Sequence, residues 1–238
     1  MNEGSALTVE NLSVKFDSQE VLKDLTFFVR RGDVMAIIGP NGAGKSVLFR
    51  ALLGLVPRSG TVVWAPGLRI NYIPQKFAID KDLPLSVKEF LGLKEHDRNK
   101  VFAALKAVGF TDEHHIEHHI LGQRIGWLSG GQLQRVLVAW SIIDEPDVLL
   151  FDEPTSGIDI GGEETIYNLL KHLKDQRDMT IILISHDLNI VYRYADNVIC
   201  LNKHMVCYGA PSEVLDPSAL AHLYGGNTGF YKHEHAHP

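Results

Sequence analysis

The sequence has few cysteines, no long apolar run and no excess of basic residues. Its only cysteines, Cys200 and Cys207, lack the spacing of a metal site. A reduced cytosolic setting and simple packing in a strand-like region would each suit them, and we interpret them as packing residues. The 23 basic residues against 29 acidic ones give a net charge of −6, which argues against a dedicated nucleic-acid-binding protein.

Segments that could enter or cross a membrane are also missing. No apolar run approaches the length of a bilayer span, and the first residues, "MNEGSALTVEN", lack the basic and apolar regions of a signal peptide. These absences predict a soluble, cytosolic protein, whose contact with a membrane would come through a partner. Internal repeats, heptads and low-complexity linkers are missing as well.

Apolar strand patterns alternate with helical patterns through much of the chain. "VMAIIG" (34–39), "VLLFDEP" (148–154) and "TIILISHD" (180–187) are typical of parallel strands buried on both faces. Helical patterns follow the first strand and separate the other two, and strand patterns with alternating polarity fill the N-terminal segment. The order predicts an α/β core with a parallel sheet, together with an N-terminal antiparallel β part.

A helical insert interrupts this core. Residues 80–140 show no strong strand pattern, whereas "SVKEFLGL" opens with a capping box formed by Ser86 and Glu89. We therefore expect residues 1–79 and 141–238 to form the core with its β part, and residues 80–140 to form a helical subdomain.

The loop "GPNGAGKS" fits the phosphate-loop motif G-x-x-x-x-G-K-[ST] and lies between a buried strand and a helix. Its backbone N–H groups and the helix N-terminus would cradle the phosphates of ATP. Lys45 would reach the β- and γ-phosphates, and the Ser46 hydroxyl would bind Mg²⁺. The residues predicted to bind nucleotide here are Gly39, Pro40, Asn41, Gly42, Ala43, Gly44, Lys45, Ser46 and Val47.

Two carboxylates stand at the end of the strand pattern "VLLFDEP". Asp152 is placed to join the Mg²⁺ ligands. Glu153 could take a proton from the attacking water or orient it, which makes it the candidate general base.

A second glycine turn, "LSGGQ", starts another helix. Ser129 and Gln132 form a capping-box pattern around Gly130 and Gly131. The glycines allow a close approach of the backbone to an anion at the positive end of the helix. The chain has one phosphate loop and one base, so this turn would serve the nucleotide of a second copy in a symmetric dimer.

These motifs, in this order and spacing, resemble the nucleotide-binding subunits of ATP-binding-cassette (ABC) transporters. The resemblance spans about residues 6–215 and rests on "GPNGAGKS", "LSGGQ", "LLFDEP" and "ISHD". It implies an α/β P-loop NTPase (RecA-like) core with an N-terminal antiparallel β part and a helical insert. It also implies that the chain hydrolyses ATP to drive an integral membrane permease, as a head-to-tail dimer on the cytoplasmic face of the cell membrane.

The resemblance assigns further residues. It implies that Gln75 links the magnesium and water to the membrane partner, and that His186 is the switch histidine near the γ-phosphate. Asp159 matches the loop aspartate at the dimer interface, and Phe16 the aromatic residue that stacks on adenine.

The chain departs from the family pattern at two positions. Val47 replaces the usual threonine, which removes a phosphate contact worth about 1 kcal/mol. Trp140 stands where relatives carry arginine, and the sequence offers no interpretation of it.

The segment 73–93 is similar to the corresponding stretch in importers of divalent transition metals, zinc foremost, with manganese and iron importers sharing much of it. An importer of this kind implies an extracytoplasmic metal-binding protein as an indirect partner. The alternatives from other classes are soluble ABC ATPases that act on nucleic acid, on translation or in metal-cluster assembly. The chain has one cassette, no long coiled coil and an acidic charge, which fit those classes less well.

Histidines gather in "EHHIEHH" and in the terminal "HEHAH". On a helix, His114 and His118 would lie one turn apart, as would His115 and His119, a spacing that can hold a metal ion. A solvated helix face with a disordered tail is the competing interpretation.

Overall fold

The computed structural model describes residues 4–75, 77, 79–153 and 160–224 of the chain. A small antiparallel sheet occupies the N-terminal part, with the strand order β2-β1-β4. Its strands are β1 (Ser5–Phe16), β2 (Gln19–Arg30) and β4 (Ser59–Trp64). The expected N-terminal antiparallel β part is therefore present.

The larger sheet has six strands and is mostly parallel. In spatial order they are β5 (Ile70–Ile73), β6 (Val148–Asp152), β7 (Thr180–Ile184), β3 (Val34–Ile38), β8 (Asn197–Asn202) and β9 (His204–Gly209). Only β9 runs antiparallel to its neighbour. Every residue of β3, β6 and β7 is buried, as the apolar runs predicted. The prediction of an α/β P-loop core is confirmed.

Alternate residues of the central strands face two separate cores. In β3, Ala36 and Ile38 belong to the core that also includes α6 (Ile160–Arg177), whereas Met35 and Ile37 belong to the core with α1 (Lys45–Leu52). The small antiparallel sheet packs on the α1 side. The C-terminal segment adds α7 (Leu188–Tyr194), α8 (Pro211–Val214) and α9 (Pro217–Tyr224).

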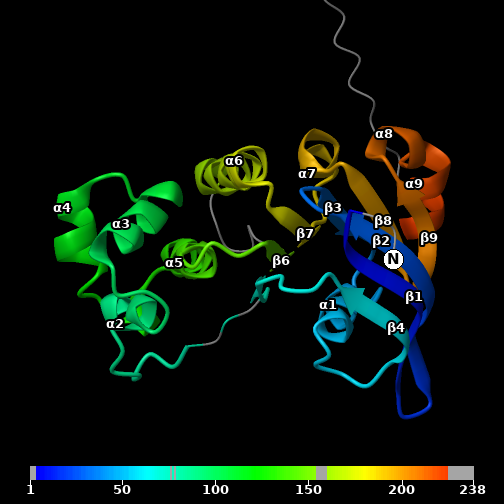
Figure 1. The fold of residues 1–238 in the computed structure, drawn as a ribbon, viewed down its shortest axis with the longest axis horizontal. Coiled ribbons are helices and arrows are strands. Elements are labelled where there is room, and N and C mark those ends of the chain that lie inside the picture. The colour runs from blue at the N-terminus through cyan, green and yellow to red at the C-terminus, as the bar shows by residue number, and fades with distance from the viewer. Residues whose placement is uncertain (1–3, 76, 78, 154–159, 225–238) are drawn as a thin grey trace, which may run out of the picture.

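The segment between β5 and β6 is helical and projects to one side of the sheet (Figure 1). It consists of α2 (Val87–Gly92), α3 (Arg98–Ala107), α4 (Glu113–His115), the π-helical turn η1 (Ile116–Ile120), the short 3₁₀ helix η2 (Ile125–Trp127) and α5 (Gly130–Ile142). Its buried side chains join the same core as Leu149 and Ile181 of the main sheet. The helices are therefore packed onto the core and do not form a separate hydrophobic centre.

The capping predictions hold in this segment. Ser86 and Glu89 bond reciprocally at the start of α2, and Ser129 and Gln132 do so at the start of α5. Gly109 follows α3 with a φ of 92°, a conformation that glycine adopts without strain.

The two cysteines pack in the core as interpreted, since Cys200 is buried and Cys207 packs against the same cluster, but the structure also joins them in a disulfide, which was not predicted and contradicts the reduced alternative. Cys200 of β8 and Cys207 of β9 are direct partners in the antiparallel register, with Cα atoms 4.8 Å apart. That separation lies within the range a disulfide spans, and the sequence alone did not reveal the hairpin that brings the thiols together.

Among the described helices, none combines the length and the apolar character required to span a bilayer.

Candidate functional site

The phosphate loop lies between the end of β3 and the start of α1. Gly39, Gly42 and Gly44 all have positive φ values, at 155°, 80° and 97°. These conformations suit glycine, and they turn the loop around the N-terminus of α1. Gly44 is the N-cap of that helix, and no side chain caps it. The first N–H groups of α1 are therefore available to an anion.

Neighbouring backbone fixes the start of this loop. A Cβ on Gly39 would lie 2.0 Å from the carbonyl oxygen of Leu201, so a larger residue cannot fit. The backbone N–H of Lys203 donates to the carbonyl of Ala43 over 3.0 Å. The hydroxyl of Tyr224 hydrogen-bonds the Gly39 backbone. The β8–β9 hairpin and α9 thus brace the loop from the C-terminal part of the chain.

Lys45 folds back over the loop. Its Nζ donates to the carbonyls of Gly39 at 2.7 Å and Pro40 at 3.1 Å. Burial lowers the pKa of this ammonium group, while the nearby charges of Glu153 and Asp152 act in the opposite direction. The ammonium is therefore held at the loop, close to both carboxylates.

Asp152 ends β6 and is only 2% exposed. Burial raises the pKa of its carboxyl, and the hydrogen bonds from Ser46 and Tyr72 lower it. The Ser46 hydroxyl and the Asp152 carboxylate thus lie in direct contact. They offer the oxygen ligands that Mg²⁺ prefers.

Glu153 directly follows β6 and has a φ of 52°. Its carboxylate accepts a hydrogen bond of 2.5 Å from the Nε2 of Gln75, a residue that follows β5. Because β5 and β6 are adjacent parallel strands, their carboxyl ends bring these two side chains together. The predicted base and the predicted water-positioning glutamine are therefore neighbours.

A cavity of about 260 Å³ gathers these groups at the carboxyl ends of the strands. Its lining residues are Val21, Asn41, Gly42, Ala43, Gly44, Lys45, Ser46, Val47, Gln75 and Glu153. Ligands of open α/β sheets bind at this edge. Nine of the ten lining residues belong to the set predicted from the sequence, and Val21 is the addition.

The second glycine turn lies elsewhere, at the start of α5. Ser129 and Gly130 are exposed, and Gly131 and Gln132 are half-buried. None of the four lines the phosphate-loop cavity. Within the described part of one chain, the two glycine turns are therefore separate surfaces.

Neither Phe16 nor His186 lines the cavity. Phe16 is 41% exposed at the end of β1, beside the turn into β2. His186 is exposed in the short connection between β7 and α7. Asp159 lies outside the described residues.

Sequence reasoning missed Tyr72. Its hydroxyl hydrogen-bonds Asp152, and burial raises its pKa to about 12, so it stays a neutral donor at physiological pH. Its ring also packs edge-on against Phe49 of α1. Tyr72 is half-buried in β5 and lies opposite Leu150 of β6, a pairing of distant segments that the sequence did not reveal.

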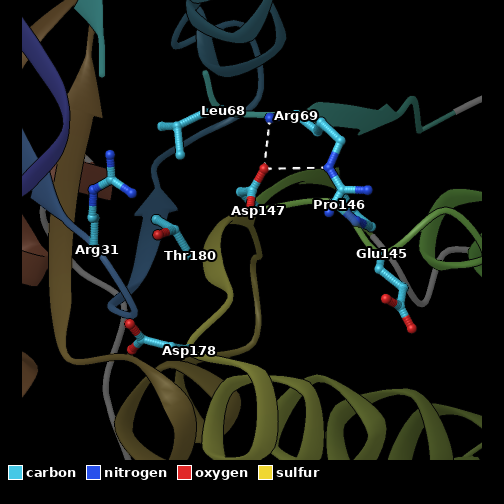
Figure 2. Close-up of a pocket in the computed structure, with 8 residues that line it drawn as sticks. All are labelled: Arg31, Leu68, Arg69, Glu145, Pro146, Asp147, Asp178 and Thr180. Carbon is cyan, nitrogen blue, oxygen red and sulfur yellow. Dashed lines mark hydrogen bonds and ion pairs between the residues drawn. The ribbon is translucent and has the colours of Figure 1, made fainter. Parts of the chain in front are cut away.

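A larger cavity of about 460 Å³ lies at the opposite edge of the sheet (Figure 2). Its lining includes Arg31, Asp178 and Thr180. It also includes Arg69 and Asp147, which form an ion pair with an Nε–Oδ2 distance of 3.5 Å. These residues precede the strands or begin them, so the cavity faces the amino ends. This is the edge that ligands of α/β sheets avoid, and we do not assign the nucleotide to it.

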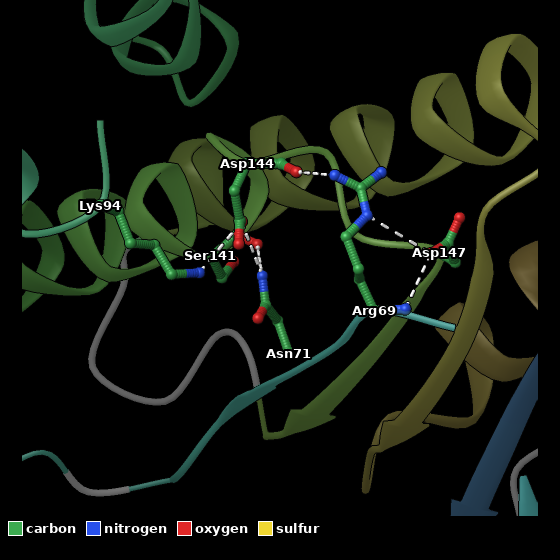
Figure 3. Close-up of polar contacts among 6 residues, drawn as sticks. All are labelled: Arg69, Asn71, Lys94, Ser141, Asp144 and Asp147. Carbon is green, nitrogen blue, oxygen red and sulfur yellow. Dashed lines mark hydrogen bonds and ion pairs between the residues drawn. The ribbon is translucent and has the colours of Figure 1, made fainter. Parts of the chain in front are cut away.

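A polar cluster joins the helical segment to β5 (Figure 3). The Asn71 amide donates to the Ser141 carbonyl at 2.6 Å and to Asp144 Oδ1 at 2.9 Å. Lys94 reaches the same carboxylate at 3.0 Å, and the Arg69 guanidinium donates to the Asp144 carbonyl at 2.6 Å. The end of α5 is therefore held by side chains from the strand that leads to Gln75.

Trp140, which the sequence left uninterpreted, belongs to this junction. Its ring stacks on Phe90 with centroids 5.6 Å apart, and the Lys94 ammonium lies 4.0 Å from its centroid. A cation over an indole face is attracted by the ring quadrupole. The residue thus packs α5 against α2 and the segment that follows it.

Together, the parallel sheet, the phosphate loop and the paired Gln75 and Glu153 define a P-loop NTPase. The family model described as ABC transporter matches residues 22–156. The chain belongs to the ABC transporter family, and it is an ATP-binding, ATP-hydrolysing subunit of that family.

Relatives extend the similarity over nearly the whole chain. The zinc import ATP-binding protein ZnuC of Pseudomonas fluorescens (strain Pf0-1) is 40% identical over 236 residues, covering 97% of this chain and 88% of the relative. The ZnuC of Yersinia enterocolitica serotype O:8 is 39% identical, covering 97% and 91%. A solved structure of a metal-chelate type ABC transporter, in an inward-facing conformation, is 28% identical, with a TM-score of 0.79 and coverage of 92% and 88%.

Proposed function

We propose that this chain is the ATP-hydrolysing subunit of a zinc importer. The observation that carries the hydrolytic part is the contact between Gln75 and Glu153 at the phosphate-loop cavity. The zinc cargo is supported by the ZnuC relatives, which match 97% of the chain.

ATP binds with its phosphates in the loop Gly39–Ser46. The uncapped N–H groups of α1 donate to the phosphate oxygens. Lys45 exchanges its two carbonyl partners for the β- and γ-phosphates, which are stronger acceptors because they are charged. Val47 contributes its backbone N–H, and Phe16 stacks on the adenine.

The Ser46 hydroxyl, the Asp152 carboxylate and the Gln75 side-chain oxygen would hold Mg²⁺. When bound, the ion neutralises charge that develops on the phosphate oxygens. Asp152 suits this role because its raised pKa reflects a buried carboxylate, which a cation stabilises.

Glu153 acts as the general base. Its carboxylate takes a proton from the attacking water while Gln75 orients that water. His186, in the connection after β7, contacts the γ-phosphate when the site closes. The positive φ at Glu153 is a strained conformation that the surrounding structure holds in place, as is common at functional sites.

Two copies complete each other's sites. Ser129, Gly130, Gly131 and Gln132 present the N-terminus of α5 to the nucleotide of the partner chain, and Asp159 lies at the same interface. The separation of the two glycine turns within one chain supports this arrangement. Two ATP molecules are then enclosed in a head-to-tail dimer.

Closure of the dimer moves a membrane permease through the helical subdomain, residues 80–140, while residues 1–79 and 141–238 form the nucleotide-binding core. The chain works on the cytoplasmic face of the cell membrane, bound to its permease. An extracytoplasmic metal-binding protein delivers zinc on the other side, and no nucleic acid takes part.

Zinc-dependent growth and ⁶⁵Zn uptake in a strain lacking the gene test this proposal. The chain should restore both, and the Glu153→Gln variant, expressed at the same level, should restore neither. Manganese and iron uptake are measured in the same strain, and the permease is sought by co-purification. Restored manganese or iron uptake without zinc uptake would reject zinc as the cargo. Unchanged metal uptake, with no membrane protein co-purifying, would reject the transport role.

A further inference from the structure

Four histidines lie on the solvent face of one short helical stretch, made of α4 and the π-helical turn η1. His114, His115, His118 and His119 are all exposed. Ile116 and Ile120 of the same stretch are fully buried and anchor it to the core. The imidazoles are therefore presented to solvent on a backbone that packing holds in place.

The π-helical turn determines which rings meet. The backbone N–H of Leu121 donates to the carbonyl of Ile116, five residues back, over 2.9 Å. In an α-helix the fifth residue along points away from the first, whereas in a π-helical turn it lies close to it. His114 consequently has two ring neighbours, His118 at 4.4 Å and His119 at 6.4 Å between centroids. His115 lies 5.3 Å from His119.

The neighbouring acidic side chains are engaged elsewhere. Glu113 pairs with Lys106, and Glu117 pairs with Arg98 at 2.9 Å, both across to α3. Asp112 accepts the backbone N–H of His114 as the N-cap of α4. In contrast, no hydrogen bond or ion pair among the described residues involves the four imidazoles. They are the uncommitted metal-ligand groups on this face.

We propose that this histidine face binds a divalent transition-metal cation of the zinc class. His114 and His118 form the first pair of ligands, and His119, the nearest third ring, turns to join them. Imidazole nitrogen suits Zn²⁺, Ni²⁺ and Cu²⁺, and water completes the coordination. Among the described residues no three ligand groups already surround a common point, so binding needs a change of side-chain rotamers.

This site is distinct from the nucleotide site. The histidine stretch lies at the outer end of the helical segment, away from the phosphate loop between β3 and α1 (Figure 1). It is also independent of the proposed cargo, because binding is measured on the chain alone, without nucleotide or permease.

Calorimetric titration of the full chain with ZnCl₂ tests the proposal. The terminal histidines His233, His235 and His237 lie outside the described residues, so a chain with all three changed to Ala serves as a second parent. On both parents, the His114→Ala/His118→Ala variant should weaken zinc binding about tenfold or more, since it removes both members of the first pair. The His115→Ala variant should weaken it less.

The matched control is His172→Ala/His204→Ala, which removes two exposed histidines from α6 and β9. It should bind zinc as the parent does. Circular dichroism verifies that each variant folds, as expected for substitutions at exposed positions.

Chemical modification of histidines locates the ion. Diethyl pyrocarbonate labels accessible imidazoles, and peptide mass spectrometry reads each position. Zinc should protect His114, His118 and His119 and leave His172 and His204 labelled. The proposal would be overturned if the His114→Ala/His118→Ala variant bound zinc with the parental affinity. It would also be overturned if changing the terminal histidines alone abolished all zinc binding.

Discussion

The two glycine turns of this chain differ in how completely each is built. The loop Gly39–Ser46 lies in a cavity, is braced by backbone from β8 and is covered by a lysine and two carboxylates. The turn Ser129–Gln132 is capped by its own side chains, is partly exposed and lines no cavity with the loop. The first turn is a nearly complete phosphate site, whereas the second is, in our proposal, one half of a site that a second copy of the chain completes.

The largest effect is expected at the base. Glu153→Gln should lower ATP hydrolysis about 10²- to 10⁴-fold, because the amide cannot take a proton from water. ATP binding should persist, and an ATP-bound dimer should accumulate, which size-exclusion chromatography with ATP detects. Hydrolysis close to the parental rate would show that Glu153 is not the base.

A positively charged side chain at Ser129, in the second turn, should lower ATP hydrolysis without affecting nucleotide binding at the first turn. Ser129→Arg places a bulky side chain where we propose that the partner's phosphate docks, and hydrolysis should fall about 10²-fold, as when a transition-state donor is lost. Nucleotide affinity of the monomer, measured with a fluorescent ATP analogue, should stay at the parental value.

Ser129→Thr is the matched control, since it retains the capping hydroxyl and should hydrolyse ATP at nearly the parental rate. If Ser129→Arg abolishes binding by the isolated monomer, Ser129 serves the nucleotide of its own chain and the two-copy arrangement is wrong.

A pair of glycine substitutions should affect stability in one turn and activity in the other. Gly39→Ala forces a Cβ against the Leu201 carbonyl at a φ of 155°, and should lower the free energy of unfolding by about 2 kcal/mol or more. Gly131→Ala lies in the helical backbone of α5, and should keep or raise that free energy while lowering hydrolysis. Urea unfolding and ATPase assays on both variants provide the measurement, and equal loss of stability would contradict the distinction.

The smallest effect is expected at Val47. Val47→Thr adds a hydroxyl beside the phosphates and should tighten ATP binding by about 1 kcal/mol, close to fivefold. Val47→Ala, which shortens the side chain without adding a donor, is the control. An unchanged affinity in the threonine variant would mean that its hydroxyl does not reach phosphate.

The sequence was most informative where local pattern alone determines structure. The buried runs of β3, β6 and β7, the capping boxes at Ser86 and Ser129, and the phosphate loop followed from residue spacing and were confirmed. The disulfide between Cys200 and Cys207 was not predicted because the pairing depends on the register between β8 and β9. Tyr72 and Trp140 were missed or left unexplained for a related reason, since their partners come from segments distant in the sequence. The structure shows where the residues around the cavity lie, whereas their roles in nucleotide binding and hydrolysis remain predictions.

The strand β5 has a mechanical consequence. Its adjacent residues Asn71 and Tyr72 point to opposite faces of the sheet, as neighbours in a strand must. The Asn71 side chain holds the end of α5, and the Tyr72 hydroxyl holds Asp152. A single peptide unit therefore separates the side chain that contacts the end of α5 from the side chain that contacts Asp152. We expect a displacement at the end of α5 to reach Asp152 over this short distance along the backbone.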